Sequence, residues 1–154
     1  MLNLQEISDR LEIQQMLIDY ANAIDASNFD ELDRLFAADA FIDHSANGSY
    51  VGPYPGFKDY VRNALSRFTH YYHLVSNIAV AIAGDTATAR CVCLNPIDVP
   101  LPGGTNQVMF IGFWYHTELV RTADGWRFSR RVQQGCFQHN IPGAIKLPLP
   151  NPKS

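Results

Sequence analysis

The period of the hydrophobic pattern changes once along the chain, near Thr69, and this change restricts the fold more than any other feature. Before it, apolar side chains recur every three or four residues, which is typical of amphipathic helices. After it, four long β-rich runs are joined by short turns. Helices followed by strands predict an α+β domain, in which three helices cover one face of a curved antiparallel sheet that can form a cone.

Three helices are predicted in the first part of the chain. The first extends from Ile7 to Ile24, and the second, from Phe29 to about Phe36, is short. Asn28 and Glu31 have the spacing of an N-cap and its reciprocal carboxylate. The third extends from Pro55 to Phe68, with proline tolerated in the first turn. The stripe of the first helix consists of Ile13, Leu17, Tyr20, Ala21 and Ile24.

Strands account for most of the remaining chain. Two short ones, Ala40 to His44 and Tyr50 to Val51, flank an Asn47-Gly48 turn and predict a hairpin. The tail from Ile141 to Ser154 is proline-rich and cannot join a central strand, so we expect it to wrap the surface or a neighbouring subunit. Residues 1–140 then form one domain and 141–154 a tail. The four long strands are Tyr71–Ala83, Thr86–Val99, Gln107–Arg121 and Trp126–Gln138.

Size and charge exclude several classes of function. At 154 residues the chain is long enough for one domain with one core. The net charge is -3 and the 12 Lys and Arg residues are scattered, so nucleic acid is not an expected partner. No apolar run is long enough to span a membrane, and the first residues lack the features of a secretory signal. We therefore expect a cytoplasmic protein that has no membrane partner.

Cysteine usage points away from disulfides and metals. Three cysteines cannot all pair within one chain. Cys91 and Cys93 are two residues apart on a predicted strand, so they share a face and are expected to be buried, reduced thiols. Because the sequence lacks the ligand sets of tetrahedral sites, we expect neither a metal nor another cofactor.

Asp25 and His73 are the first candidates for chemistry. Asp25 follows the apolar stripe of the first helix, although a plain helix-end residue is an equally simple interpretation. The period of two along a strand places His73, Val75 and Asn77 on one face and His70 on the opposite face. The two histidines are therefore not expected to bind one metal ion together. A buried structural histidine is the alternative. A neutral imidazole is a usable base near pH 7, and a carboxylate at its far nitrogen would fix its tautomer.

Tyr20 and an arginine of the last strand are further candidates. Tyr20 belongs to the apolar stripe, so its hydroxyl could meet a ligand, although core packing explains it as well. Strict alternation from Trp126 and Phe128 points Arg130 inward, whereas a β-bulge would substitute Arg131. The residues alone leave this choice open.

Several segments together resemble the SnoaL-like branch of the nuclear-transport-factor-like (NTF2-like) superfamily, whose members fold as an α+β cone. The nearest likeness is to bile-acid dehydratase and hexachlorocyclohexane dehydrochlorinase, small lyases related to scytalone dehydratase. The matching segments cover nearly the whole chain and are Ile13 to Ala21, Asp25, Phe36 to Ala40, Thr69 to Asn77 and Gly125 to Ser129.

The resemblance implies roles for four residues. Asp25 and His73 match a helix-end Asp that supports a base His. Tyr20 matches the tyrosine of the bile-acid enzyme, at a position where the dehydrochlorinase has lysine. Arg131 is the nearest match to an arginine that reaches the pocket from the last strand, with Arg130 as the competing assignment. Relatives of this type are trimers, so a homotrimer is implied.

The expected activity is therefore a cofactor-free elimination on an apolar cyclic small molecule. Such a molecule would lie in a pocket with few charges. Two other functions remain open: an isomerase or polyketide cyclase of the same fold, and a non-catalytic ligand-binding or assembly module. The residues expected to line the pocket are Phe68, Met109, Phe113 and Tyr115.

Overall fold

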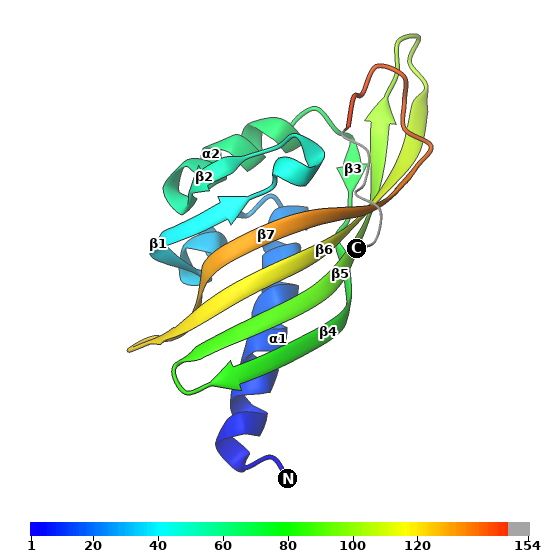
Figure 1. Cartoon of the computed structure of the whole chain (residues 1–154). Helices are drawn as coiled ribbons and strands as arrows, with labels where there is room; N and C mark the ends of the chain where they lie inside the picture. The colour runs from blue at the N-terminus through cyan, green and yellow to red at the C-terminus, as the bar shows by residue number, and fades with distance from the viewer. Residues whose placement is uncertain (148–154) are drawn as a thin grey trace.

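A seven-stranded curved sheet with helices on its inner side dominates the computed structural model, which describes residues 1–147 (Figure 1). The helices are α1 (Leu4–Asp25), the 3-10 helices η1 (Phe29–Arg34) and η2 (Ser45–Asn47), and α2 (Tyr54–Leu65). The strands are β1 (Phe36–Asp43), β2 (Val51–Pro53), β3 (His70–Tyr71), β4 (Leu74–Ala83), β5 (Thr86–Pro100), β6 (Asn106–Thr122) and β7 (Gly125–His139).

The sheet has the order β2-β1-β7-β6-β5-β3, and β4 also pairs with β5. β5, β6 and β7 form the expected antiparallel meander, with the long β5–β6 ladder extending from Thr86 opposite Val120 to Pro100 opposite Asn106. One pair departs from the antiparallel pattern, since β1 runs parallel to β7. This contact joins the first strand of the chain to the last and closes one side of the cone.

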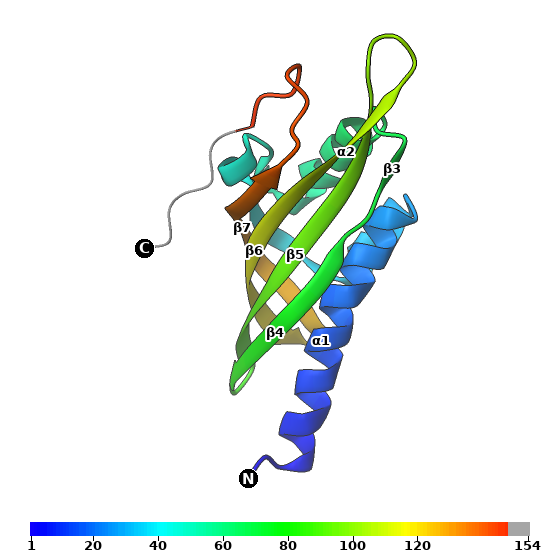
Figure 2. The ribbon, with the colours of Figure 1, turned by 90° about the vertical axis from the view of Figure 1, so that its right-hand side faces the viewer.

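Helix α1 lies along the inner side of the sheet beside β4 (Figure 2). It begins with a capping box, in which the Asn3 side chain accepts from the Glu6 backbone N–H and the Glu6 side chain accepts from the Asn3 backbone N–H. All five residues of the predicted apolar stripe are buried in the core. Burial of this stripe, at roughly 25 cal/mol per Å² of apolar surface, holds the helix against the sheet.

The second helix differs from the α-helix that the sequence predicts. It is a 3-10 helix that ends at Arg34, and Asn28 makes no capping hydrogen bond through its side chain. The chain enters the sheet immediately afterwards, because the backbone N–H of Phe128 donates to the carbonyl of Leu35 at 2.8 Å and Phe36 pairs with Phe128. Pairing with β7 therefore starts β1 four residues before the predicted strand.

The first long strand of the prediction is interrupted at Tyr72 and His73, which separate β3 from β4. The backbone N–H of His73 donates to the Asp25 carboxylate at 2.9 Å. Further along, the β4–β5 register shifts between Ser76 and Ala79, and Asn77 has a positive φ of 53°. The predicted shared face therefore does not reach Asn77, which is exposed, whereas His73 lines the cavity and Val75 packs against the core.

The described part of the tail folds back on its own chain. Ile141, Ile145 and Leu147 pack against an apolar cluster that includes Met109 and Phe113. Residues 148–154, where the rest of the predicted tail lies, are outside the described residues. Within residues 1–147, no helix is long and apolar enough to cross a membrane.

Candidate active site

Asp25 and His73 form the polar pair of the candidate site. Asp25 is the last residue of α1, and His73 lies in the break between β3 and β4. The Asp25 Oδ1 atom is 2.6 Å from His73 Nδ1, while Oδ2 accepts the His73 backbone N–H at 2.9 Å. Both side chains are largely buried, with 18 % and 11 % of their surface exposed. The carboxylate therefore fixes both the ring and the backbone of His73.

This geometry determines which ring nitrogen is free. Because a carboxylate only accepts hydrogen bonds, the neutral imidazole carries its proton on Nδ1 and keeps a lone pair on Nε2. A carboxylate at the C-terminal end of α1 faces the negative end of the helix dipole, which disfavours it. The two hydrogen bonds from His73 offset this cost, and they account for the position of Asp25.

His73 lines a partly open cavity of about 300 Å³. The cavity lies between the inner face of the sheet, helix α2 and residues 144–147 of the tail. Its walls are mainly apolar and aromatic, which suits a small hydrophobic ligand. The structure places all four residues of the predicted pocket in the wall: Phe68, Met109, Phe113 and Tyr115.

Tyr20 also lines this cavity, from the middle of the α1 stripe. Only 3 % of the residue is exposed, and burial raises the pKa of its hydroxyl to about 12. The hydroxyl therefore stays protonated and can donate a hydrogen bond at neutral pH. Its ring covers the guanidinium of Arg131, whose Cζ lies 4.0 Å from the ring centroid.

Arg131 points inward but lies behind the wall of the cavity. Its guanidinium is fully buried between the rings of Tyr20 and Tyr115, 3.9 Å from the latter centroid. It is absent from the cavity wall, so the expectation that it reaches the pocket directly is wrong. Its positive charge nevertheless acts there, because it opposes the burial-driven rise in the pKa of Tyr20.

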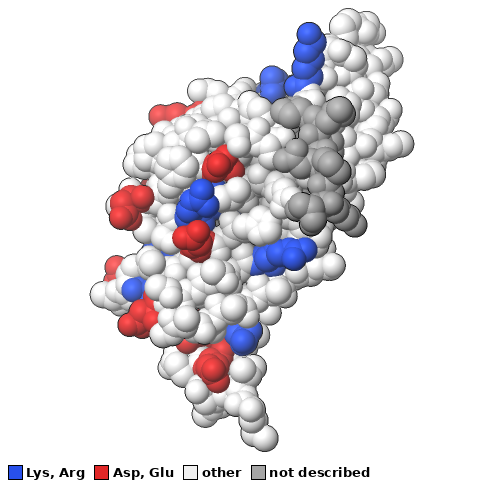
Figure 3. Space-filling model, viewed as in Figure 1, with Lys and Arg blue, Asp and Glu red and all other residues white. Residues whose placement is uncertain are grey.

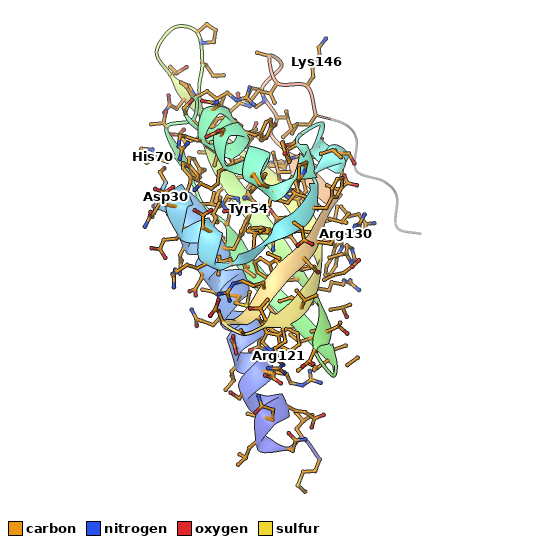
Figure 4. All side chains as sticks on the ribbon, turned by 90° about the vertical axis from the view of Figure 1, so that its left-hand side faces the viewer. Asp30, Tyr54, His70, Arg121, Arg130 and Lys146 are labelled. Atoms are coloured by element: carbon orange, nitrogen blue, oxygen red, sulfur yellow. The ribbon has the colours of Figure 1, made fainter. Side chains whose placement is uncertain are left out.

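A β-bulge decides between Arg131 and Arg130. The β6–β7 register shifts between Glu118 and Leu119, so that Glu118 faces Arg130 while Leu119 faces Phe128 and Ser129 is the extra residue. Arg130 consequently lies on the outer side of β7, 3.9 Å from Glu118 (Figure 4). The bulge moves Arg131 to the inner face, as the resemblance implied.

Sequence reasoning missed several polar residues of the cavity wall, of which His44, Asn95 and Gln133 are about 95 % buried. Asn95 accepts a weak hydrogen bond from the Cys93 thiol at 3.2 Å. Within residues 1–147, His44 Nε2 and Gln133 Oε1 have no hydrogen-bond partner. The signal was present in the alternation, since His44 follows the inward residues Ala40 and Ile42 by the same step of two.

The cysteines and the potential metal ligands do not add chemistry to the cavity. Cys91 and Cys93 are buried, free thiols, as their spacing predicts. Burial raises the pKa of the Cys93 thiol to about 12, so it stays in its weakly nucleophilic form. Among residues 1–147, no three His, Cys, Asp or Glu side chains are grouped closely enough to hold a metal ion. The absence of a cofactor remains a prediction.

Comparison with known proteins gives a family for this fold and site. Residues 5–132 match the model of the SnoaL-like domain. Uncharacterised protein Rv2910c of Mycobacterium tuberculosis is 49 % identical over 138 residues, which cover 90 % of this chain and 92 % of that protein.

Two solved structures have the same fold at lower identity. Hexachlorocyclohexane dehydrochlorinase LinA-type3 from Novosphingobium barchaimii has a TM-score of 0.75 at 24 % identity, covering 95 % of this chain and 99 % of its own. A scytalone dehydratase candidate from Novosphingobium aromaticivorans has a TM-score of 0.74 at 20 % identity, covering 99 % and 97 %. The family match covers most of the chain and shows that the chain belongs to the SnoaL-like family.

Proposed function

We propose that the protein is a cofactor-free lyase that eliminates water from an apolar cyclic small molecule, with His73 as the general base. The observation that carries this proposal is the Asp25–His73 pair, whose imidazole lines a cavity with many apolar and aromatic residues in its wall. A base of this kind needs a free lone pair, a fixed orientation and a counter-charge for its protonated form. Asp25 supplies the fixed orientation and the counter-charge.

The elimination transfers one proton and breaks one carbon–oxygen bond. His73 Nε2 removes a proton from a carbon next to an activating group, and Asp25 stabilises the imidazolium that results. The electrons of the broken C–H bond form the carbon–carbon double bond, while the hydroxyl leaves the neighbouring carbon. Return of a proton to that hydroxyl gives water and restores the neutral imidazole. A positioned base typically contributes about a hundred- to ten-thousand-fold to the rate.

Tyr20 and Arg131 assist the oxygen on which negative charge develops. The Tyr20 hydroxyl is protonated, because burial raises its pKa to about 12, so it can donate a hydrogen bond to the departing or developing oxygen. Arg131 acts from behind the rings of Tyr20 and Tyr115, where its charge is shielded from bulk water. A fixed positive charge in such a dry site favours an anionic transition state.

The names of two structural neighbours support an elimination. One is a hexachlorocyclohexane dehydrochlorinase and the other a scytalone dehydratase candidate. At these identities each shares only the fold with this chain. Tyr20 favours a hydroxyl leaving group over chloride here, since a phenol can donate a hydrogen bond to a departing oxygen.

The test uses two small probes, 3-hydroxycyclohexanone and a β-hydroxydecalone, whose dehydration gives an absorbing enone. Each is incubated with the wild-type protein and with His73→Ala, and the enone is followed by ultraviolet absorbance in light and heavy water. We expect the wild type to form the enone from at least one probe. We expect His73→Ala to be at least about a hundredfold slower, with a thermal midpoint within a few degrees of the wild type.

Other outcomes would support the alternatives. Deuterium incorporation into the ketone without loss of water would indicate an isomerase or cyclase, in which the base returns the proton. Binding of both probes without any reaction, equal in the wild type and His73→Ala, would indicate a binding module and contradict the lyase.

The proposal also covers assembly, partner and location. We expect a homotrimer, and exposed apolar side chains such as Leu74, Val108 and Phe137 on the strands are available for subunit contacts. Light scattering coupled to size-exclusion chromatography tests this. A small molecule is the expected partner, in keeping with the interspersed acidic and basic side chains on the face in Figure 3. The buried thiols of Cys91 and Cys93, which form no disulfide, accord with a reducing cytoplasm.

A further inference from the structure

Three residues of the cavity wall have a buried polar atom without a partner within residues 1–147: His44 at Nε2, Gln133 at Oε1 and Asn47 at Oδ1. Asn47 is only partly buried, whereas His44 and Gln133 are each only 5 % exposed. Buried polar groups are almost always hydrogen-bonded, because an unpaired one retains the cost of leaving water. Neither residue takes part in the proposed elimination. Two such atoms in the wall of one cavity indicate a position for a polar group of the ligand.

The sheet register brings the two residues together. Ile42 on β1 pairs with Arg131 on the parallel strand β7, and both are buried on the inner face. One alternation step further are His44, directly after the end of β1, and Gln133 on β7, which are also buried. The two residues are therefore neighbours on one side of the cavity. His73 enters from the β3–β4 break, and β5 and β6 separate β7 from that edge in the strand order (Figure 1).

Both side chains are held in place by aromatic neighbours. The His44 ring packs edge-on against Phe57, with centroids 5.3 Å apart, and lies 6.0 Å from the Tyr115 ring. The Gln133 amide donates from Nε2 to the Tyr115 hydroxyl at 3.3 Å, which leaves its Oε1 as a free acceptor. The two unpaired atoms are thus fixed by packing before any ligand arrives, which is the usual property of a binding site.

The chemistry of these atoms selects the group that fits. Gln133 Oε1 requires a hydrogen-bond donor. A carboxylate does not fit, because it would place a second acceptor against this oxygen. A cation is disfavoured, because Arg131 is close enough to lower the pKa of His44 by its charge. A hydroxyl satisfies both atoms at once, because it donates to Oε1 while its oxygen accepts from an imidazole N–H. Burial lowers the pKa of His44 to about 3, so its ring is neutral at pH 7.

We infer that His44 and Gln133 form a recognition site for an uncharged hydroxyl group on the cyclic ligand. This inference rests on the proposed function only in taking the cavity as the ligand site. It adds a determinant of affinity: a hydroxyl that projects toward β1 and β7 when the reacting carbon lies at His73 tightens binding. Purely hydrocarbon or halogenated rings fill the apolar walls but leave both atoms unpaired.

The test measures binding and needs no turnover, so it is independent of whether the protein is a lyase. The probes are 2-naphthol, 2-methylnaphthalene, in which a methyl group replaces the hydroxyl, and the anion 2-naphthoate. Dissociation constants are measured by fluorescence titration at pH 7 for the wild type, His44→Phe, Gln133→Met and His73→Ala. Thermal midpoints establish that each variant is folded.

We expect the wild type to bind 2-naphthol about tenfold more tightly than 2-methylnaphthalene, as two ordinary hydrogen bonds would give. This preference should disappear in His44→Phe and Gln133→Met and persist in His73→Ala. In the wild type, the NMR resonances of the His44 ring should shift with 2-naphthol but not with the methyl analogue. This measurement holds even if the substituted proteins fail to fold.

Four results would overturn the inference: equal binding of 2-naphthol and 2-methylnaphthalene, tighter binding of 2-naphthoate, a hydroxyl preference that is lost only in His73→Ala, and no binding of 2-naphthol up to its solubility. If the hydroxyl preference is found but the enone assay fails, the recognition site stands and the lyase is wrong. If the enone assay succeeds and the hydroxyl preference is absent, the lyase proposal stands and the recognition site is wrong.

Discussion

Asp25 is hydrogen-bonded to His73 through both carboxylate oxygens. Its Oδ1 lies 2.6 Å from the ring Nδ1, and its Oδ2 lies 2.9 Å from the backbone nitrogen. One side chain thus sets the tautomer of the base and also the path of the chain where the ladder between β3 and β4 is interrupted. The relationship connects the end of the first helix to the cavity. It also makes the role of each oxygen separately testable.

Asp25→Asn should reduce turnover by about a thousandfold or more while the fold persists. The amide nitrogen of Asn can donate to Nδ1, which moves the imidazole proton to Nε2 and removes the lone pair from the cavity side. Enone formation in the assay described above measures the loss. The matched control is Asp19→Asn on the exposed side of the same helix, where Asp19 accepts only from Gln15. If both variants retain activity, the tautomer argument is wrong.

His44 should not shape the pH dependence of the reaction between pH 5 and 8. Burial lowers the pKa of His44 to about 3, so His44 stays neutral across this range. The measurement is kcat/KM against pH for the wild type and His44→Phe, and the two profiles should have the same shape. A profile that changes shape in His44→Phe would show that His44 titrates between pH 5 and 8.

His44 should instead affect stability in acid. Its pKa is about 3 in the folded protein against an ordinary value of 6.5, so the unfolded state binds a proton that the folded state excludes between those values. The stabilisation is therefore complete above about pH 6.5 and is lost as the pH falls toward 3. Urea unfolding at pH 7 and pH 4.5 should show a smaller acid destabilisation in His44→Phe than in the wild type. Equal losses would show that His44 becomes charged within the fold.

The sequence was sufficient wherever the periodicity within one element decides the outcome. The stripe of α1, the meander of β5 to β7 and the shared face of Cys91 and Cys93 all follow from spacing alone. The same rule correctly allowed a bulge before Arg131, but it could not select the bulge. That choice depends on the pairing between β6 and β7, which becomes known only with the register.

The errors arose where two distant segments compete for the same backbone groups. The short second helix gives way to β1 because the Leu35 carbonyl accepts from Phe128, almost a hundred residues later in the chain. Likewise, the strand is interrupted at His73, where the backbone N–H donates to the carboxylate of Asp25. Periodicity predicts which face of a strand a side chain is on, but it does not predict which other side chains or cavities that side chain contacts. This is why Arg131 was expected in the pocket and His44 was missed.

Asp9 should stabilise the fold without contributing to the cavity. Its side chain is 4 % exposed and accepts from both terminal nitrogens of Arg121, at 2.9 Å and 2.7 Å, and from the Trp126 indole. Asp9→Asn removes the charge from this buried pair and should cost about 3 kcal/mol in urea unfolding at pH 7. Asp85→Asn is the control, because the same arginine meets this exposed aspartate at 3.1 Å and its loss should cost below about 1 kcal/mol.

The pH dependence separates the two aspartates further. The Arg121 hydrogen bonds hold the pKa of Asp9 well below its ordinary value of 3.8. Stability from Asp9 is thus complete above about pH 5 and declines as the pH falls through that lowered value. The difference between the wild type and Asp9→Asn should shrink below pH 4. Arg121 lies beside the N-terminal part of α1 (Figure 4), so enone formation should be unchanged in both variants.

Arg131→Met should lower turnover while raising the free energy of unfolding. Within residues 1–147 the guanidinium has no carboxylate partner, and its Nε and Nη2 atoms have no hydrogen bond. Desolvating such a charge costs several kcal/mol, and each unpaired group adds about 1 to 3 kcal/mol. The stacking on Tyr20 and Tyr115 returns about 2 kcal/mol per ring. The costs exceed the gain, so methionine should stabilise the protein by about 1 kcal/mol or more.

The control for a functional role of Arg131 is its neighbour Arg130. Arg130 is partly exposed and lies 3.9 Å from Glu118, so Arg130→Met should change stability by less than about 0.5 kcal/mol and leave turnover intact. Urea unfolding and the enone assay on the two variants give a direct comparison. If Arg131→Met is both active and less stable than the wild type, the guanidinium serves packing, and the electrostatic part of the mechanism fails while the role of His73 is untouched.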